Sequence, residues 1–147
     1  MDNTTIKSTK SDFQDYYNSR FSRIYFNEEL KTIICELKAE YVPIEHFKDT
    51  FYKVSELVEA GNNHKFIFDK RSLRAFHQPS MEWYFVVWKQ EMYEKGLKIH
   101  RKILPPEPWF QKSVAIAKEQ ISREHHDLII EKLDIRYCDS VEEAIET

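Results

Sequence analysis

Hydrophobic and polar positions change their period along the chain, and these changes predict an alternation of strands and helices. Two apolar runs, residues 21–26 and 30–37, are separated by a polar turn at residues 27–29 and predict an antiparallel hairpin. Across residues 44–58 the apolar positions recur at steps of three and four, which is typical of one helix face. The uninterrupted apolar run at residues 65–69 predicts a buried interior strand.

The second half of the chain continues this alternation. An apolar stripe over residues 79–95 predicts a second helix, and Ser80 is expected to cap its N-terminus. Residues 97–104 predict another strand. A further helical stripe covers residues 109–125, and residues 133–138 predict the last strand.

This order of elements predicts the fold class. Ser140 and Glu143 have the spacing of a capping box, which predicts a short terminal helix. Strands that alternate with helices favour right-handed crossovers and parallel pairing. We therefore expect a single α/β domain over residues 21–147, with a mixed, mostly parallel sheet of about five strands, an N-terminal antiparallel hairpin and flanking helices. Residues 1–20 are polar and predict a flexible N-terminal arm.

Composition narrows the class of protein. A chain of 147 residues that is 41% hydrophobic can bury a core, and its two glycines argue against a glycine-rich phosphate loop. Cys35 and Cys138 lie in apolar runs and are interpreted as buried free thiols, so we expect a reducing, cytoplasmic setting. The first residues lack the apolar segment of a signal peptide, and no apolar run is long enough for a membrane helix.

Charge is distributed unevenly along the chain. The net charge of −3 is too mild to indicate a nucleic-acid partner. Residues 65–104 nevertheless hold nine lysine and arginine residues against four aspartate and glutamate residues. The middle of the chain is therefore the place where a basic patch is expected.

Three stretches together resemble the STAS-like, SpoIIAA-like group of small bacterial domains, named after anti-sigma-factor antagonists. The first is the opening hairpin with its turn at residues 27–29. The second is Phe66-Ile67-Phe68-Asp69, followed by a loop and a tryptophan-bearing helix that contains Glu82-Trp83. The third is residues 135–140 followed by residues 141–145, a strand, an acidic turn and a short helix. The resemblance covers residues 21–147.

The resemblance implies a non-catalytic regulatory or protein-interaction module. Phosphorylated members of the group carry an Asp-Ser-Ser-Gly motif at the helix that follows the central strand. Ser80 falls near that place, but the acidic residue and the glycine are missing, so we expect a helix cap there and no phosphoswitch. The strand that contains residues 100–102 departs from the group in having His-Arg-Lys where apolar residues are expected.

One candidate ligand site follows from the expected topology. Asp69, Arg71 and Arg74 follow the central strand, and ligands of open α/β sheets bind beyond the carboxyl ends of strands. The helix that begins near Ser80 adds free N–H groups, and Trp109 follows the next strand. These five residues predict a crevice for a small anion. The alternatives are a solvated loop with paired arginines, and a structural or an acid-base role for Asp69.

The sequence gives weaker support for a metal site and for a partner surface. His125-His126 are adjacent on a helix and do not converge on one ion, so neither a metal nor a cofactor is expected. Trp83 and Tyr93 fall off the main helical stripe and indicate either core packing or a partner surface, including that of a homodimer.

The sequence predicts no enzyme, because no nucleophile with an oriented base is recognisable. The alternative to a regulatory module is a carrier of a small apolar or anionic ligand, since the STAS-like fold resembles CRAL-TRIO domains in topology. An unrecognised hydrolase is the third class. A carrier predicts an enclosed, mostly apolar cavity of about 300 Å³ or more, whereas an interaction module predicts none.

Overall fold

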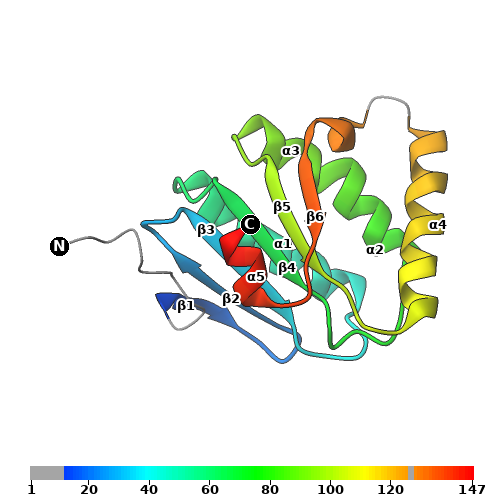
Figure 1. Cartoon of the computed structure of the whole chain (residues 1–147), viewed down its shortest axis with the longest axis horizontal. Helices are drawn as coiled ribbons and strands as arrows, with labels where there is room; N and C mark the ends of the chain where they lie inside the picture. The colour runs from blue at the N-terminus through cyan, green and yellow to red at the C-terminus, as the bar shows by residue number, and fades with distance from the viewer. Residues whose placement is uncertain (1–11, 126–127) are drawn as a thin grey trace.

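A computed structural model describes residues 12–125 and 128–147 and contains one six-stranded sheet, with the strands in chain order. The first three strands pair antiparallel, and the third to the sixth pair parallel (Figure 1). The expected mixed α/β sheet with its N-terminal hairpin is confirmed, with six strands in place of about five. The strands are β1 (Gln14–Asn18), β2 (Ser22–Asn27), β3 (Thr32–Leu37), β4 (Lys65–Asp69), β5 (Ile99–Ile103) and β6 (Asp134–Tyr137).

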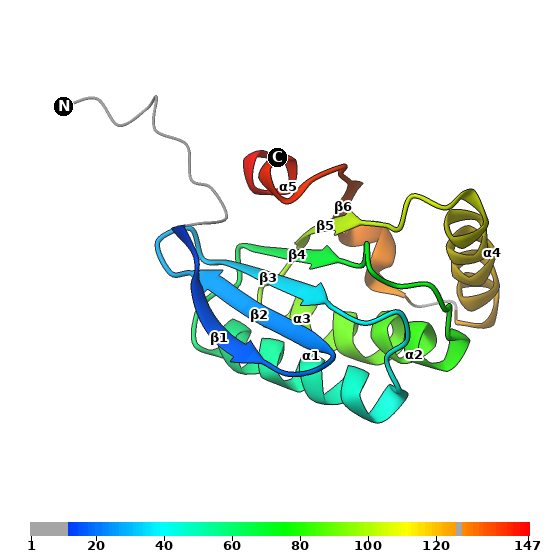
Figure 2. The same cartoon turned by 90° about the horizontal axis from the view of Figure 1, so that it is seen from below.

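The helices lie mainly on one side of the sheet. Successive parallel strands are neighbours, so right-handed crossovers place their connecting helices on the same face. Figure 2 shows α1, α2 and α3 below the sheet and α5 alone above it, with α4 beyond the end of α2. No described helix is long and apolar enough to cross a membrane. The helical elements are α1 (Ile44–Glu59), α2 (Gln78–Trp83), the π-helix η2 (Tyr84–Trp88), α3 (Lys89–Glu94), α4 (Pro108–Glu124), the 3₁₀ helix η3 (Ile129–Lys132) and α5 (Val141–Glu146).

Strand β1 corrects the expectation of a flexible arm over residues 1–20. It pairs antiparallel with β2, with an irregularity in register between Asp15 and Tyr17. The Arg23 Nε donates to Asp15 Oδ1 at 2.8 Å, and the Tyr16 hydroxyl hydrogen-bonds to Glu56 on α1. Because β1 is an edge strand held partly by polar contacts, its mostly exposed residues lack the apolar alternation that marks a strand. Residues 1–11 of the expected arm lie outside the described part.

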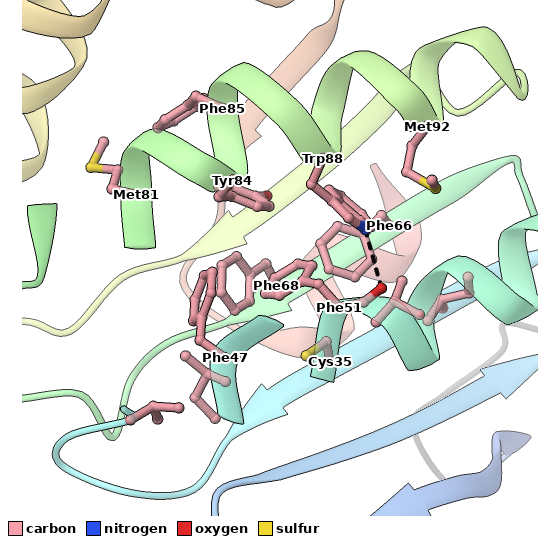
Figure 3. Packing of buried hydrophobic residues seen from close by; sticks show 14 of the residues in the cluster. Cys35, Phe47, Phe51, Phe66, Phe68, Met81, Tyr84, Phe85, Trp88 and Met92 are labelled. Atoms are coloured by element: carbon pink, nitrogen blue, oxygen red, sulfur yellow. Dashed lines mark hydrogen bonds between the residues drawn. The ribbon is translucent and has the colours of Figure 1, made fainter. Parts of the chain in front are cut away.

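Strand β4 organises the two faces of the sheet. Phe66 and Phe68 point to the side covered by α1 and α2, while Ile67 packs on the α5 side. All three residues are almost fully buried, which confirms the expected interior strand. Figure 3 shows these phenylalanines surrounded by aromatic side chains from α1 and from the helix that runs from α2 to α3, among them Phe51 and Trp88. The fold therefore places an aromatic layer directly beneath the carboxyl end of β4.

Candidate functional site

A small cavity lies at the carboxyl ends of β3 and β4, beside the start of α2. Its volume is about 50 Å³, which has room for a few water molecules or for a ligand of a few heavy atoms. Its wall is mostly apolar, with a small number of polar groups that reach it from α2, from η2 and from the loops after β3 and β4. The lining residues are Leu37, Tyr41, Val42, Phe47, Phe68, Lys70, Leu73, Ala75, Phe76, His77, Ser80, Met81, Tyr84, Phe85, Phe110 and Val114.

Lys70 is the cation that lines this cavity. The residue directly follows β4, and its backbone N–H donates to the Ile103 carbonyl at 2.8 Å, which fixes it at the sheet edge. Because side chains alternate between the two faces along β4, the Lys70 side chain lies on the same face as Phe68. Its Nζ lies 5.0 Å from the centroid of the Phe68 ring. The residue is only 8% exposed. Burial, and then the positive charge of Lys118, lowers the pKa of Lys70 from 10.5 to about 8.

Two further lysines are buried behind the cavity. Lys89 on α3 and Lys102 on β5 are at most 1% exposed. Within residues 12–125 and 128–147 neither amino group has a hydrogen-bond partner other than the amino group of the other lysine. Burial lowers the pKa of both side chains well below the ordinary value, and the repulsion between them lowers that of Lys102 further. A buried pair of amines of this kind disfavours two protons at once.

The ring of Phe85 is the common neighbour of these lysines. The Nζ atoms of Lys102, Lys89 and Lys118 lie 4.3, 5.1 and 5.9 Å from its centroid. Cation–π attraction compensates such charges only in part. In the described chain no carboxylate pairs with Lys70, Lys89 or Lys102, so no anionic group offsets the effect of burial on their pKa values.

The π-helix η2 brings these groups together. It lies inside what the sequence predicts as one helix over residues 79–95, and Tyr84, Phe85, Trp88 and Lys89 are all buried along it and at its end. Single π turns inside α-helices are uncommon and occur often at functional sites. The Tyr84 hydroxyl is also buried without a hydrogen-bond partner among the described groups, and burial raises its pKa well above 10.

The arginines of the predicted anion crevice are already paired. Arg71 binds Asp69 with two side-chain bonds, Nη2 to Oδ2 at 2.8 Å and Nε to Oδ1 at 3.0 Å, and its backbone N–H donates to the same carboxylate. Arg74 binds Glu107 at 3.2 Å and donates to backbone carbonyls of its own loop. This geometry matches the alternative of a loop with paired arginines, and it gives Asp69 a structural role in that loop.

Ser80 and Trp109 are placed differently from each other. Ser80 alone of the five predicted residues lines the cavity, whereas Trp109 is half exposed and packs edge-on against Phe110. The prediction that Ser80 caps α2 is wrong. The helix begins at Gln78, and the cap is His77, whose Nδ1 accepts from the Ser80 N–H at 3.3 Å and contacts the Ser80 hydroxyl at 2.8 Å.

Sequence reasoning missed the three lysines that form the site. Lys70 lies in the loop of the predicted anion crevice but was not among the five residues predicted to form it, and Lys89 occupies a position four residues after Phe85 on the buried face of its helix. Two signals pointed here: the basic excess at residues 65–104, and the unexpected His-Arg-Lys at residues 100–102. Alternation along β5 sends Lys102 to the same face as Phe68.

A wider groove adjoins the cavity along α4. Its volume is about 620 Å³, and Val114 lines both spaces. Lys118 stands in this groove and donates to the Tyr137 hydroxyl at 3.2 Å. The groove therefore brings a fourth lysine close to the buried cluster from the solvent side.

A possible metal-ligand set lies on the opposite end of α4. Atoms of Glu82, Glu124 and His125 lie within 4.8 Å of one another, and His125 Nε2 is 3.5 Å from Glu82 Oε1. These residues are exposed or half-buried, and an exposed acidic group of this kind is common without a metal. His126, the other histidine of the predicted pair, lies outside the described residues.

Comparisons of the chain with protein-family models, with curated proteins and with solved structures gave no significant match. The cavity and the lysines around it are therefore the features of the molecule that bear on its function.

Proposed function

We propose that this protein is a non-catalytic regulatory module of STAS-like type that binds a small anionic ligand in the cavity beside Lys70. The observation that carries the proposal is a set of buried lysines without a carboxylate partner among the described residues, one of which lines the cavity. A buried ammonium group is normally paired, so an anion bound beside Lys70 would supply the partner that stabilises its protonated form.

The dimensions of the cavity define the class of ligand. A volume of about 50 Å³ is far below the size expected for a carrier of lipid-sized molecules. A carboxylate with a short carbon chain fits both the space and the surroundings, because Leu73, Phe76 and Met81 offer apolar contacts opposite the ammonium group of Lys70. Buried free thiols at Cys35 and Cys138 support a reducing compartment such as the cytoplasm as the place of action.

Thermal unfolding in the presence of short carboxylates tests this proposal. Acetate and propionate are expected to raise the melting temperature at a pH below the pKa of Lys70, relative to chloride at equal ionic strength. Octanoate is expected to have no specific effect because its chain exceeds the cavity. A ligand at 100 times its Kd stabilises the folded state by about 2.7 kcal/mol, which is readily measured.

Two substitutions make the test specific. Lys70→Met removes the charge but keeps most of the volume, and should abolish the response to acetate. Lys112→Met, on the exposed side of α4, is the matched control and should keep it. An equal response in both variants would show that the stabilisation is not due to this cavity.

A further inference from the structure

Lys70 has the surroundings of a nucleophilic amine. Its side chain borders the cavity, and its amino group forms no hydrogen bond or ion pair with the described residues beyond its contact with the Phe68 ring. An incoming molecule therefore meets this amine without displacing a bonded partner. By contrast, the cations Arg71 and Lys65, which also belong to or follow β4, are held by hydrogen bonds to protein oxygens.

The surroundings of Lys70 keep a fraction of its amino groups unprotonated. Burial is the main cause of its lowered pKa of about 8, and no facing carboxylate restores the charge. At neutral pH an amine with this pKa is unprotonated on the order of 100 times more often than one with the ordinary pKa of 10.5. The titratable groups that act on it or line the cavity with it are Lys118 from α4, Lys89 from α3, Lys102 from β5, Tyr84 from η2, His77 before α2 and Tyr41 after β3.

We propose that Lys70 forms a reversible imine with a short oxo acid that enters the cavity. The amine lone pair attacks the carbonyl carbon, a carbon–nitrogen double bond forms, and the carbonyl oxygen leaves as water with the two amine hydrogens. No oxidant or reductant is needed, and hydrolysis reverses the step. This inference rests on the proposed binding function and adds a covalent bond to it.

Two properties of the site select an oxo acid over other carbonyl compounds. The small volume admits only a few heavy atoms beside Nζ. The positive charge of Lys118, which acts on Lys70, favours a molecule that carries a carboxylate next to its carbonyl group. Glyoxylate and pyruvate have both features, and glyoxylate is the smaller probe.

Reductive trapping tests the imine directly. The full chain is incubated with glyoxylate, reduced with borohydride, and digested for peptide mass mapping. The expected product is a secondary amine at Lys70, with a mass increase of one glyoxylate minus water plus two hydrogens. Labelling of Lys70 should be at least about tenfold faster than labelling of the exposed Lys112 in the same sample.

The pH dependence separates an activated amine from an accessible one. The trapping rate at Lys70 should level off above a pH of about 8. Equal rates at Lys70 and Lys112, or a Lys70 rate that keeps rising well above a pH of about 8, would overturn the inference. Because both lysines are compared in the unmodified chain, this result does not depend on whether a Lys70→Met variant folds.

Two further arms distinguish this inference from the binding proposal. If acetate stabilises the protein through Lys70 but glyoxylate is not trapped, the binding proposal stands and the imine is wrong. If acetaldehyde, which lacks a carboxylate, is trapped at Lys70 as fast as glyoxylate, the assignment of an oxo acid is wrong.

Discussion

The indole Nε1 of Trp88 donates to the backbone carbonyl of Phe51 at 3.1 Å, and this bond ties the π-helix η2 to α1 (Figure 3). The same indole donates to the Ser55 hydroxyl at 2.9 Å, and that hydroxyl donates to the Phe51 carbonyl. Trp88 therefore anchors the helix segment that presents Tyr84 and Lys89 to the sheet. The network explains why a tryptophan is suited to a fully buried position there.

Trp88→Phe is expected to destabilise the fold by about 2–4 kcal/mol, because it removes a buried hydrogen-bond donor and leaves part of the indole volume empty. Trp109→Phe is the control, since Trp109 is half exposed and should change the free energy of unfolding by less than about 0.5 kcal/mol. Urea denaturation measures both values. Similar effects of the two substitutions would argue against the anchoring role.

Lys89→Met and Lys102→Met are each expected to stabilise the ligand-free protein, by about 1–3 kcal/mol. Methionine fills nearly the same space, and the substitution removes an amine that is buried without an oxygen acceptor among the described residues. The two effects should not add, because removal of one lysine relieves the other of its repulsion. Chemical denaturation of the single and double variants measures this. Destabilisation by either substitution would indicate that the amine has a stabilising partner in solution.

The stability of the wild-type protein should rise with pH relative to that of Lys70→Met. Between pH 8 and 10.5 the unfolded chain still holds the proton on this amine while the folded chain has released it, so a higher pH favours the folded state. The full difference across this window is about 3 kcal/mol. Burial raises the pKa of Tyr84 and of Cys35 in both proteins, so their effects cancel in the comparison. A difference that stays constant with pH would mean that Lys70 keeps its ordinary pKa.

Ser140→Ala should destabilise the protein by about 1 kcal/mol. The Ser140 hydroxyl accepts from the Glu143 N–H at 3.1 Å, as the capping-box pattern predicts. The Glu143 carboxylate departs from that pattern, because it accepts at 2.8 Å from the N–H of Asp139, the residue before the cap. Ser113→Ala on α4 is the control, since that hydroxyl only donates to a carbonyl of its own helix. If calorimetry gives the same melting temperature for both variants, the cap does not contribute to stability.

Periodicity in the sequence was sufficient for most of the fold. A local hydrophobic pattern was enough to predict the β2–β3 hairpin, the buried β4 and the helices α1 and α4. Such a pattern does not depend on which element packs against it. Strand β1 was missed because its stability comes from pairing with β2 and from polar contacts with distant residues such as Glu56, which leave no local pattern.

The site was predictable in place but not in its residues. The carboxyl end of β4 follows from topology, and Ser80 and Lys70 both lie there. Arg71 and Arg74 are more typical anion ligands, yet each is paired with a carboxylate that the sequence could not assign. Lys89 and Lys102 come from separate elements, and only the packing of η2 on β5 shows that their amino groups share one buried region.

Helix α5 and the chain end after it supply carbonyl acceptors for two cations on the Ile67 face of the sheet. Lys65 donates to the carbonyls of Ala144 and Ile145 at 3.0 and 2.8 Å, and Arg101 donates to the Thr147 carbonyl at 2.9 Å. Lys65 and Arg101 belong to adjacent central strands. Detachment of α5 would leave the buried Lys65 without either of these acceptors, and would leave the buried Arg101 only its bonds to His100 and Asp134. The helix is short, but it should open together with the centre of the sheet as one cooperative unit. Its amide hydrogens should then exchange with solvent at the slow rate of β4, rather than at the fast rate of a fraying chain end.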